Sequence, residues 1–105
     1  MSNSLNSFIE ENRERLLSEL KEYLAIPSIS TLPEHKEDVS SAASFVAESL
    51  KSVGLENVKL IQPESVSSLT EGRHPLVYAD WLHAPGKPTI LCYGHYDVQP
   101  PDPLH

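Results

Sequence analysis

The fold class is decided by one stretch, Thr89-Ile90-Leu91-Cys92-Tyr93, which leads directly into Gly94-His95-Tyr96-Asp97. A short, nearly unbroken apolar run is typical of a strand whose two sheet faces are both covered, as in α/β proteins. We therefore expect an interior strand at Thr89–Tyr93. Its C-terminal end would present His95 and Asp97 on one side, where open α/β sheets bind their ligands.

Two helices are predicted upstream of this strand. Apolar residues at helical spacing from Leu5 to Leu24 predict an amphipathic helix that Pro27 ends. Ser7 would cap it, or Asn3 or Ser4 if it begins one turn earlier. A second apolar stripe predicts a helix from Asp38 or Ser40 to Gly54, where glycine and the following leucine fit a Schellman ending.

Two shorter strands are predicted between the second helix and the interior strand. They cover Val58–Ile61 and Leu76–Leu82, and a turn follows at Ala84–Pro88. The order helix, helix, strand, strand, strand indicates an α/β fold with a mixed sheet flanked by helices. No element that could cover the last strand follows Val98, so we expect residues 1–105 to be the N-terminal segment of a larger domain, with apolar surface exposed along Ile90, Leu91 and Cys92.

Composition excludes several classes of partner. Eight basic and fifteen acidic residues give the 105-residue chain a formal charge of −7, which disfavours binding to nucleic acid and to anionic membrane surfaces. No apolar run approaches the ~20 residues that span a bilayer. The single cysteine, Cys92, excludes an intrachain disulfide and indicates a cytoplasmic protein, and its apolar neighbours predict an inert packing thiol.

His95 and Asp97 are the residues best suited to carry chemistry. Neutral imidazole is a good zinc ligand, and a metal-bound histidine usually has its other ring nitrogen held by a carboxylate or a carbonyl. A His-x-Asp pair taken alone is more often structural than functional. The remaining histidines and two further carboxylates are interpreted as exposed or locally bonded groups: His35, His74, His83, His105, Asp80 and Asp102.

The block around this pair is more specific. Tyr93-Gly94-His95-Tyr96-Asp97-Val98-Gln99-Pro100 resembles the first metal-site motif of the zinc-dependent peptidase superfamily that includes aminoacylases, carboxypeptidase G, acetylornithine deacetylase and the dipeptidases. The Gln99-Pro100 ending looks most like the dipeptidase branch. The segment Leu24-Ala25-Ile26-Pro27-Ser28-Ile29-Ser30 supports the resemblance, which extends over essentially the whole chain.

The resemblance implies a fold, a reaction and two roles. Residues 1–105 would be the N-terminal segment of a metallopeptidase catalytic domain, in which His95 binds one of two zinc ions and Asp97 is the catalytic residue that orients or polarises His95. The complete enzyme would hydrolyse dipeptides or short peptides through a metal-activated water. A homodimer formed through a C-terminal region beyond these residues would also fit the resemblance.

Two alternatives stay open. An N-acyl-amino-acid deacylase of the same superfamily shares the first motif, and a non-catalytic truncated fragment would have no activity of its own. A catalytic zinc needs about three protein ligands, and His95 is one. We therefore expect the 105-residue chain alone to bind zinc weakly and to be inactive.

Overall fold

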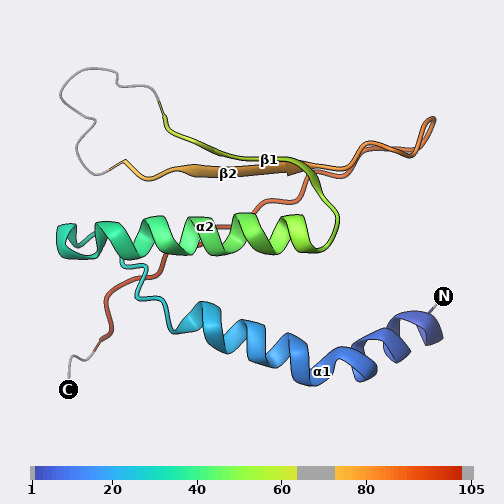
Figure 1. Cartoon of the computed structure of the whole chain (residues 1–105), viewed down its shortest axis with the longest axis horizontal. Coiled ribbons are helices and arrows are strands. Elements are labelled where there is room, and N and C mark those ends of the chain that lie inside the picture. The colour runs from blue at the N-terminus through green and yellow to red at the C-terminus, as the bar shows by residue number, and fades with distance from the viewer. Residues whose placement is uncertain (1, 64–72, 103–105) are drawn as a thin grey trace.

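The computed structural model describes residues 2–63 and 73–102. Its elements are helix α1 (Ser2–Leu24), a 3-10 turn η1 (Pro33–His35), helix α2 (Lys36–Ser52), strand β1 (Glu56–Ile61) and strand β2 (Leu76–Asp80). In Figure 1, α2 lies between the two-stranded sheet and α1. Residues 64–72, which include most of the predicted polar connection between the strands, lie outside the described residues.

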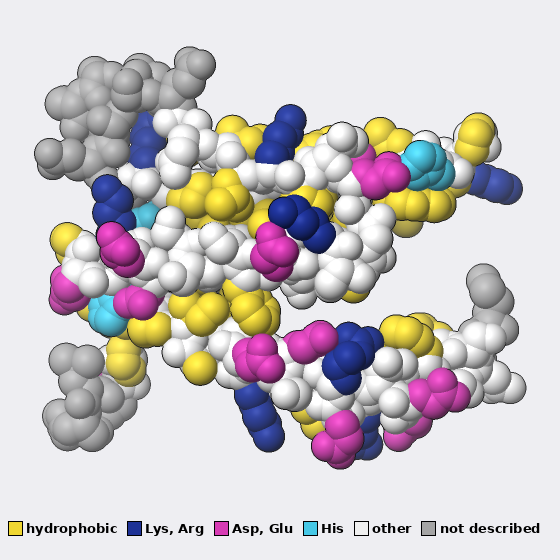
Figure 2. Space-filling view, in the orientation of Figure 1, with side chains coloured by type: hydrophobic (Ala, Val, Ile, Leu, Met, Phe, Trp, Pro, Cys, Tyr) yellow, Lys and Arg dark blue, Asp and Glu magenta, His cyan; other side chains and the backbone are white. Residues whose placement is uncertain are grey.

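Helix α1 is amphipathic, but its apolar side is uncovered. It begins at Ser2, earlier than a Ser7 cap would place it, and ends three residues before Pro27. Leu5 and Leu24 are 60% and 63% exposed. Figure 2 shows Asp and Glu side chains together with Lys and Arg side chains along its visible face. Arg15 Nη1 lies 2.9 Å from Glu19 Oε1 on this helix. No helix in the described part of the chain is long and apolar enough to cross a membrane.

Helix α2 carries most of the buried core. It begins at Lys36, two residues before Asp38, because η1 leads directly into it. Val39, Ala42, Ala43 and Ala47 are its buried residues, and their small size lets the sheet pack closely against this face. The predicted Schellman ending is confirmed. Gly54 has φ +93°, its N–H donates to Lys51 O at 3.0 Å, and the Leu55 N–H donates to Leu50 O at 3.1 Å.

The sheet has two antiparallel strands in the described residues. Glu56 pairs with Asp80 and Ile61 with Leu76, and the register shifts between Glu56 and Lys59. One extra residue on β1 is accommodated there as a β-bulge, where Asn57 adopts φ +53°. The predicted strands are confirmed with changed ends, since β1 begins two residues earlier and β2 ends two residues before Leu82.

The third predicted strand is wrong for this structure. Residues 89–93 form no strand and pair with no other described segment, and Leu91 and Tyr93 are each 91% exposed. A strand exists only where a neighbour completes its hydrogen bonds, and no described segment forms backbone hydrogen bonds with these residues. The predicted packing of Cys92 is therefore also wrong, because Cys92 is exposed. The sheet of the described residues consists of the antiparallel pair β1 and β2. The apolar surface expected along Ile90, Leu91 and Cys92 is confirmed.

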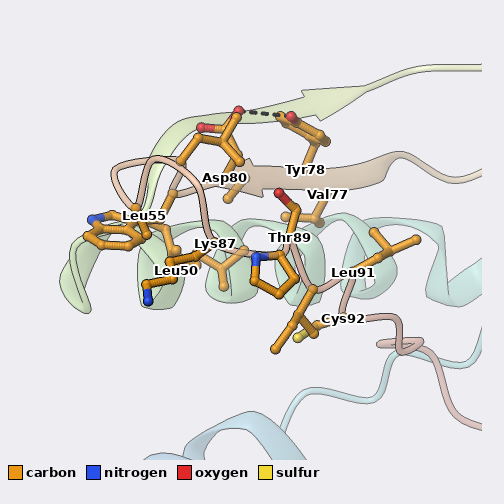
Figure 3. A pocket seen from close by; sticks show the side chains of 15 residues that line it. Leu50, Leu55, Val77, Tyr78, Asp80, Lys87, Thr89, Leu91 and Cys92 are labelled. Carbon is orange, nitrogen blue, oxygen red and sulfur yellow. Dashed lines mark hydrogen bonds between the residues drawn. The ribbon is translucent and has the colours of Figure 1, made fainter.

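The turn before this segment has the geometry expected for its sequence. Lys87 N–H donates to Ala84 O at 3.1 Å, and Gly86 has φ +76°. A proline followed by a glycine with positive φ is the type II arrangement, so the turn at Ala84–Pro88 is confirmed. The returning chain borders an open groove of about 780 Å³. Figure 3 shows this groove between the end of α2, β2 and the unpaired segment, and neither His95 nor Asp97 lines it.

Candidate metal centre

The loop that carries His95 and Asp97 is attached to the connection between α1 and α2. Val98 N–H donates to Ser28 O at 2.9 Å, and Ile29 and Val98 form a parallel bridge. Ile29 is 8% exposed and Ser28 is 1% exposed, so the connection is itself well packed. The loop is therefore positioned by residues almost 70 positions earlier in the sequence, although residues 89–93, which lead into it, form no strand.

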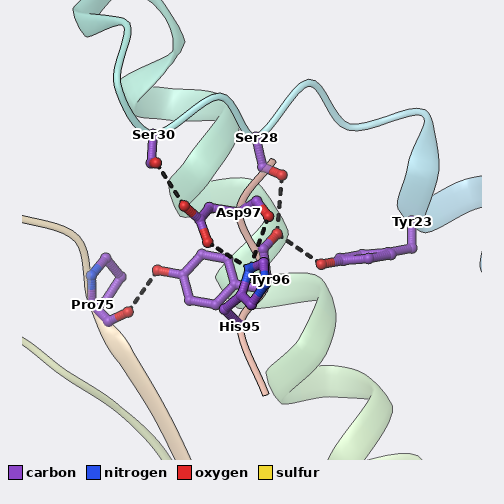
Figure 4. Close-up of polar contacts among 7 residues, drawn as sticks. All are labelled: Tyr23, Ser28, Ser30, Pro75, His95, Tyr96 and Asp97. Atoms are coloured by element: carbon purple, nitrogen blue, oxygen red, sulfur yellow. Dashed lines mark hydrogen bonds and ion pairs between the residues drawn. The ribbon is translucent and has the colours of Figure 1, made fainter. Parts of the chain in front are cut away.

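A second set of bonds, which we call the Tyr96 clamp, holds the loop backbone. Tyr96 O accepts hydrogen bonds from Tyr23 Oη at 2.7 Å and from Ser28 Oγ at 3.0 Å. The Tyr96 hydroxyl donates to Pro75 O at 2.6 Å. Figure 4 shows these bonds converging from the end of α1, the connection and the start of β2. Three separate segments thus meet at the residue between His95 and Asp97.

His95 and Asp97 meet as the sequence predicted. His95 Nδ1 lies 2.9 Å from Asp97 Oδ1 and 3.2 Å from Asp97 O. A carbonyl oxygen and an ionised carboxylate only accept hydrogen bonds, so Nδ1 must carry the proton. The His95 side chain is 73% exposed, and no hydrogen bond to Nε2 is found in the described part of the chain. This arrangement leaves Nε2 as the nitrogen able to bind a metal.

The other oxygen of Asp97 is occupied too. Ser30 Oγ donates to Asp97 Oδ2 at 2.6 Å. This hydrogen bond, with the weaker one from His95, lowers the pKa of Asp97 below its ordinary value of 3.8, although partial burial opposes the shift. Asp97 is therefore ionised at neutral pH. Partial burial of Tyr96 and Tyr23, and secondly the negative charge of Asp97, raise the pKa values of both phenols, so both remain protonated donors.

The described residues supply one candidate metal ligand, His95, and not a complete metal site. Across residues 2–63 and 73–102, no group of three or more His, Cys, Asp or Glu side chains could hold a metal ion. His35 bonds locally to Asp38 at 2.8 Å, and His83 is exposed and bonds to Glu56 at 2.6 Å, so the prediction of exposed or locally bonded groups is confirmed for both. His105 lies outside the described residues.

Sequence reasoning missed the residues that surround the pair. Tyr23, Ser28 and Ser30 bond to the loop, and His74 donates from Nε2 to Ser30 O at 3.1 Å. One signal was available in the sequence. Two small hydroxyl residues flank an isoleucine in Ser28-Ile29-Ser30, a period-two pattern in which the isoleucine is buried and both hydroxyls bond to the loop.

Comparisons with known proteins give consistent results, although no family model matches the chain. The chain is 34% identical to the Cys-Gly metallodipeptidase DUG1 of Candida albicans over 88% of its own length and 20% of that protein's. It is 33% identical to the Saccharomyces cerevisiae protein of the same name over 95% of its length and 22% of that protein's. A Beta-Ala-His dipeptidase of Rattus norvegicus is 26% identical, again over 20% of its length.

A solved structure agrees with the sequence comparison. The described fold superposes on the dipeptidase Dug1p of Saccharomyces cerevisiae with a TM-score of 0.80 and 30% identity, covering 96% of this chain and 22% of that one. The α/β arrangement is thus that of a partial, N-terminal piece of the Dug1p catalytic domain. The chain spans about a fifth of the length of the curated relatives that it matches. Sequence and structure together identify it as homologous to the N-terminal part of the metallodipeptidases, in agreement with the resemblance of the His95 block.

Proposed function

We propose that residues 1–105 form the N-terminal segment of the catalytic domain of a zinc dipeptidase that hydrolyses dipeptides or short peptides. The observation that carries this proposal is the His95–Asp97 pair, in which Nδ1 is held by a carboxylate and Nε2 remains available. The similarity to proteins named as metallodipeptidases supports a peptide substrate and a metal cofactor. Those names favour peptide hydrolysis over the N-acyl-amino-acid deacylase alternative.

Each of the two residues has a defined task in this proposal. His95 would bind one zinc ion through Nε2, and Asp97 would keep the proton on Nδ1 and hold the ring in place. Two bound zinc ions would supply Lewis-acid activation of a water molecule and of the peptide carbonyl. The described residues contain no group of three or more possible metal ligands, so the remaining zinc ligands and the general base would lie elsewhere in the full-length protein.

The proposal also covers location and assembly. A single cysteine in the sequence supports a cytoplasmic enzyme. A homodimer would form through a region outside residues 1–105, and sedimentation of the full-length protein tests that part separately.

Hydrolysis and metal content of the full-length protein test the proposal together. Cys-Gly, β-Ala-His and an N-acetyl amino acid are offered as substrates to the wild type, to His95→Ala and to His83→Ala. His83 is a matched control because it is also exposed and bonded to a carboxylate, yet lies on a different segment. We expect a dipeptide to be hydrolysed, His95→Ala to lose at least about 100-fold in zinc affinity together with activity, and His83→Ala to retain both.

Three results would overturn the proposal. Unchanged zinc binding and activity in His95→Ala would remove the metal role. Faster cleavage of the acylated amino acid than of either dipeptide would favour the deacylase alternative. A full-length protein that hydrolyses none of the three substrates with zinc supplied would refute the proposed peptidase activity.

A further inference from the structure

We propose that Ser30 is a positioning residue that fixes the rotation of the Asp97 carboxylate and, through it, the tautomer of His95. Its hydroxyl donates to Asp97 Oδ2 at 2.6 Å, while Asp97 Oδ1 accepts from His95 Nδ1 at 2.9 Å. The three side chains form one chain of hydrogen bonds that ends at the exposed Nε2 (Figure 4). The consequence for zinc binding rests on the proposed function, whereas the effect on the tautomer does not.

The carboxylate needs a second contact to be fixed. The terminal torsion of an aspartate is broad, so a single bond to His95 would leave the plane of the carboxylate free to turn. A donor on Oδ2 and a donor on Oδ1 together define that plane. Because hydrogen bonds to an ionised carboxylate are shorter and stronger than neutral ones, the Ser30 bond is well suited to this task.

Ser30 is itself held at its backbone. His74 Nε2 donates to Ser30 O at 3.1 Å, and the neighbouring residue Ile29 is buried and bridged to Val98. The Ser30 hydroxyl therefore projects from a backbone segment that is held by His74 and by Val98. Ser30 is half-buried, so water could act as the hydrogen-bond partner of its hydroxyl. A fixed backbone would not be needed if the hydroxyl only required a partner.

The tautomer is the property that should respond. Free neutral histidine favours a proton on Nε2, whereas the acceptors at Asp97 favour a proton on Nδ1. Loss of the Ser30 hydroxyl would let the carboxylate turn away and weaken that preference. One hydrogen bond of ordinary strength corresponds to a change of about three- to tenfold in the tautomer ratio.

Nitrogen-15 NMR of labelled histidine in the metal-free, full-length protein tests this at a pH where His95 is neutral. The set comprises wild type, Ser30→Ala, Ser30→Thr and the control Ser40→Ala, an exposed serine of α2. We expect the Nδ1–H to Nε2–H ratio of His95 to fall about three- to tenfold in Ser30→Ala. It should return toward the wild-type value in Ser30→Thr, which keeps the hydroxyl, and stay unchanged in Ser40→Ala.

Zinc affinity measured by chelator competition separates this inference from the proposed function. We expect Ser30→Ala to lose roughly three- to tenfold in affinity, less than the 10- to 100-fold typical of a direct partner of a ligand. An unchanged tautomer ratio in Ser30→Ala, or no recovery in Ser30→Thr, overturns the inference. A shifted ratio with zinc affinity unaffected even in His95→Ala supports the role of Ser30 and refutes the metal role of His95.

Discussion

The Tyr96 clamp predicts non-additive effects of two substitutions. Tyr23 and Ser28 donate to the same acceptor, Tyr96 O, at 2.7 and 3.0 Å. In Tyr23→Phe the carbonyl keeps the Ser28 donor, and in Ser28→Ala it keeps the Tyr23 donor. In the double variant it has neither, so the cost of an unsatisfied carbonyl is added to the two lost bonds.

The expected magnitudes follow from the number of donors left. Each single substitution should cost about 0.5 to 1 kcal/mol, the usual net value of one hydrogen bond. Leaving the carbonyl without a donor adds roughly 1 kcal/mol, since Ser28 is 1% exposed and water has poor access to its side of the clamp. The coupling energy is therefore about 1 kcal/mol, which corresponds to roughly a fivefold factor beyond the product of the single effects.

Hydrogen exchange of the Val98 amide in the full-length protein measures this coupling locally. That amide donates to Ser28 O at 2.9 Å, so its protection reports opening of the loop. Tyr78→Phe and Ser40→Ala provide a control pair that shares no acceptor and should act additively. If Tyr23→Phe and Ser28→Ala combine additively within about 0.3 kcal/mol, the shared acceptor has no energetic role and the clamp is refuted.

Three further predictions concern α2 and the loop. Gly54→Ala should destabilise the protein by about 1 kcal/mol in thermal unfolding, because φ is +93° although an added Cβ meets nothing within 4 Å. Val39→Ala should cost about 2 kcal/mol in urea unfolding, since Val39 is fully buried, while the exposed neighbour in Ser40→Ala should cost little. Because the pKa of Asp97 is lowered, its ionised carboxylate stabilises the folded protein at neutral pH, and this stabilisation is lost as pH falls below about 3.8. The difference in free energy of unfolding between the metal-free wild type and Asp97→Asn should therefore shrink over that range.

Local features of the fold could be predicted because they depend on residues close in sequence. Pro27 limits α1, and the Gly54–Leu55 pair ends α2, through the geometry of the backbone at those positions. The contact between His95 and Asp97 belongs to the same class, because two positions of spacing let the side chains meet within one loop. None of these three predictions required knowledge of a distant partner.

The features that failed or were missed depend on distant partners. The apolar pattern at residues 89–93 predicts a strand, but pairing requires a neighbouring strand that the described residues do not supply. Ser30 reaches Asp97 across 67 positions, and Tyr23 reaches Tyr96 across 73. The Ser28-Ile29-Ser30 pattern marks two hydroxyls beside a buried isoleucine, but a single sequence does not say which acceptors they reach, since serine and tyrosine hydroxyls bond equally well to many acceptors.

A crystal structure of the zinc-loaded, full-length protein tests the central claim most directly, because it shows which nitrogen of His95 contacts the metal. The account predicts zinc at about 2.0 to 2.1 Å from His95 Nε2, with Asp97 Oδ1 still bonded to Nδ1 and Ser30 Oγ still on Oδ2. Zinc bound through Nδ1, or a zinc site from which His95 is absent, would contradict it.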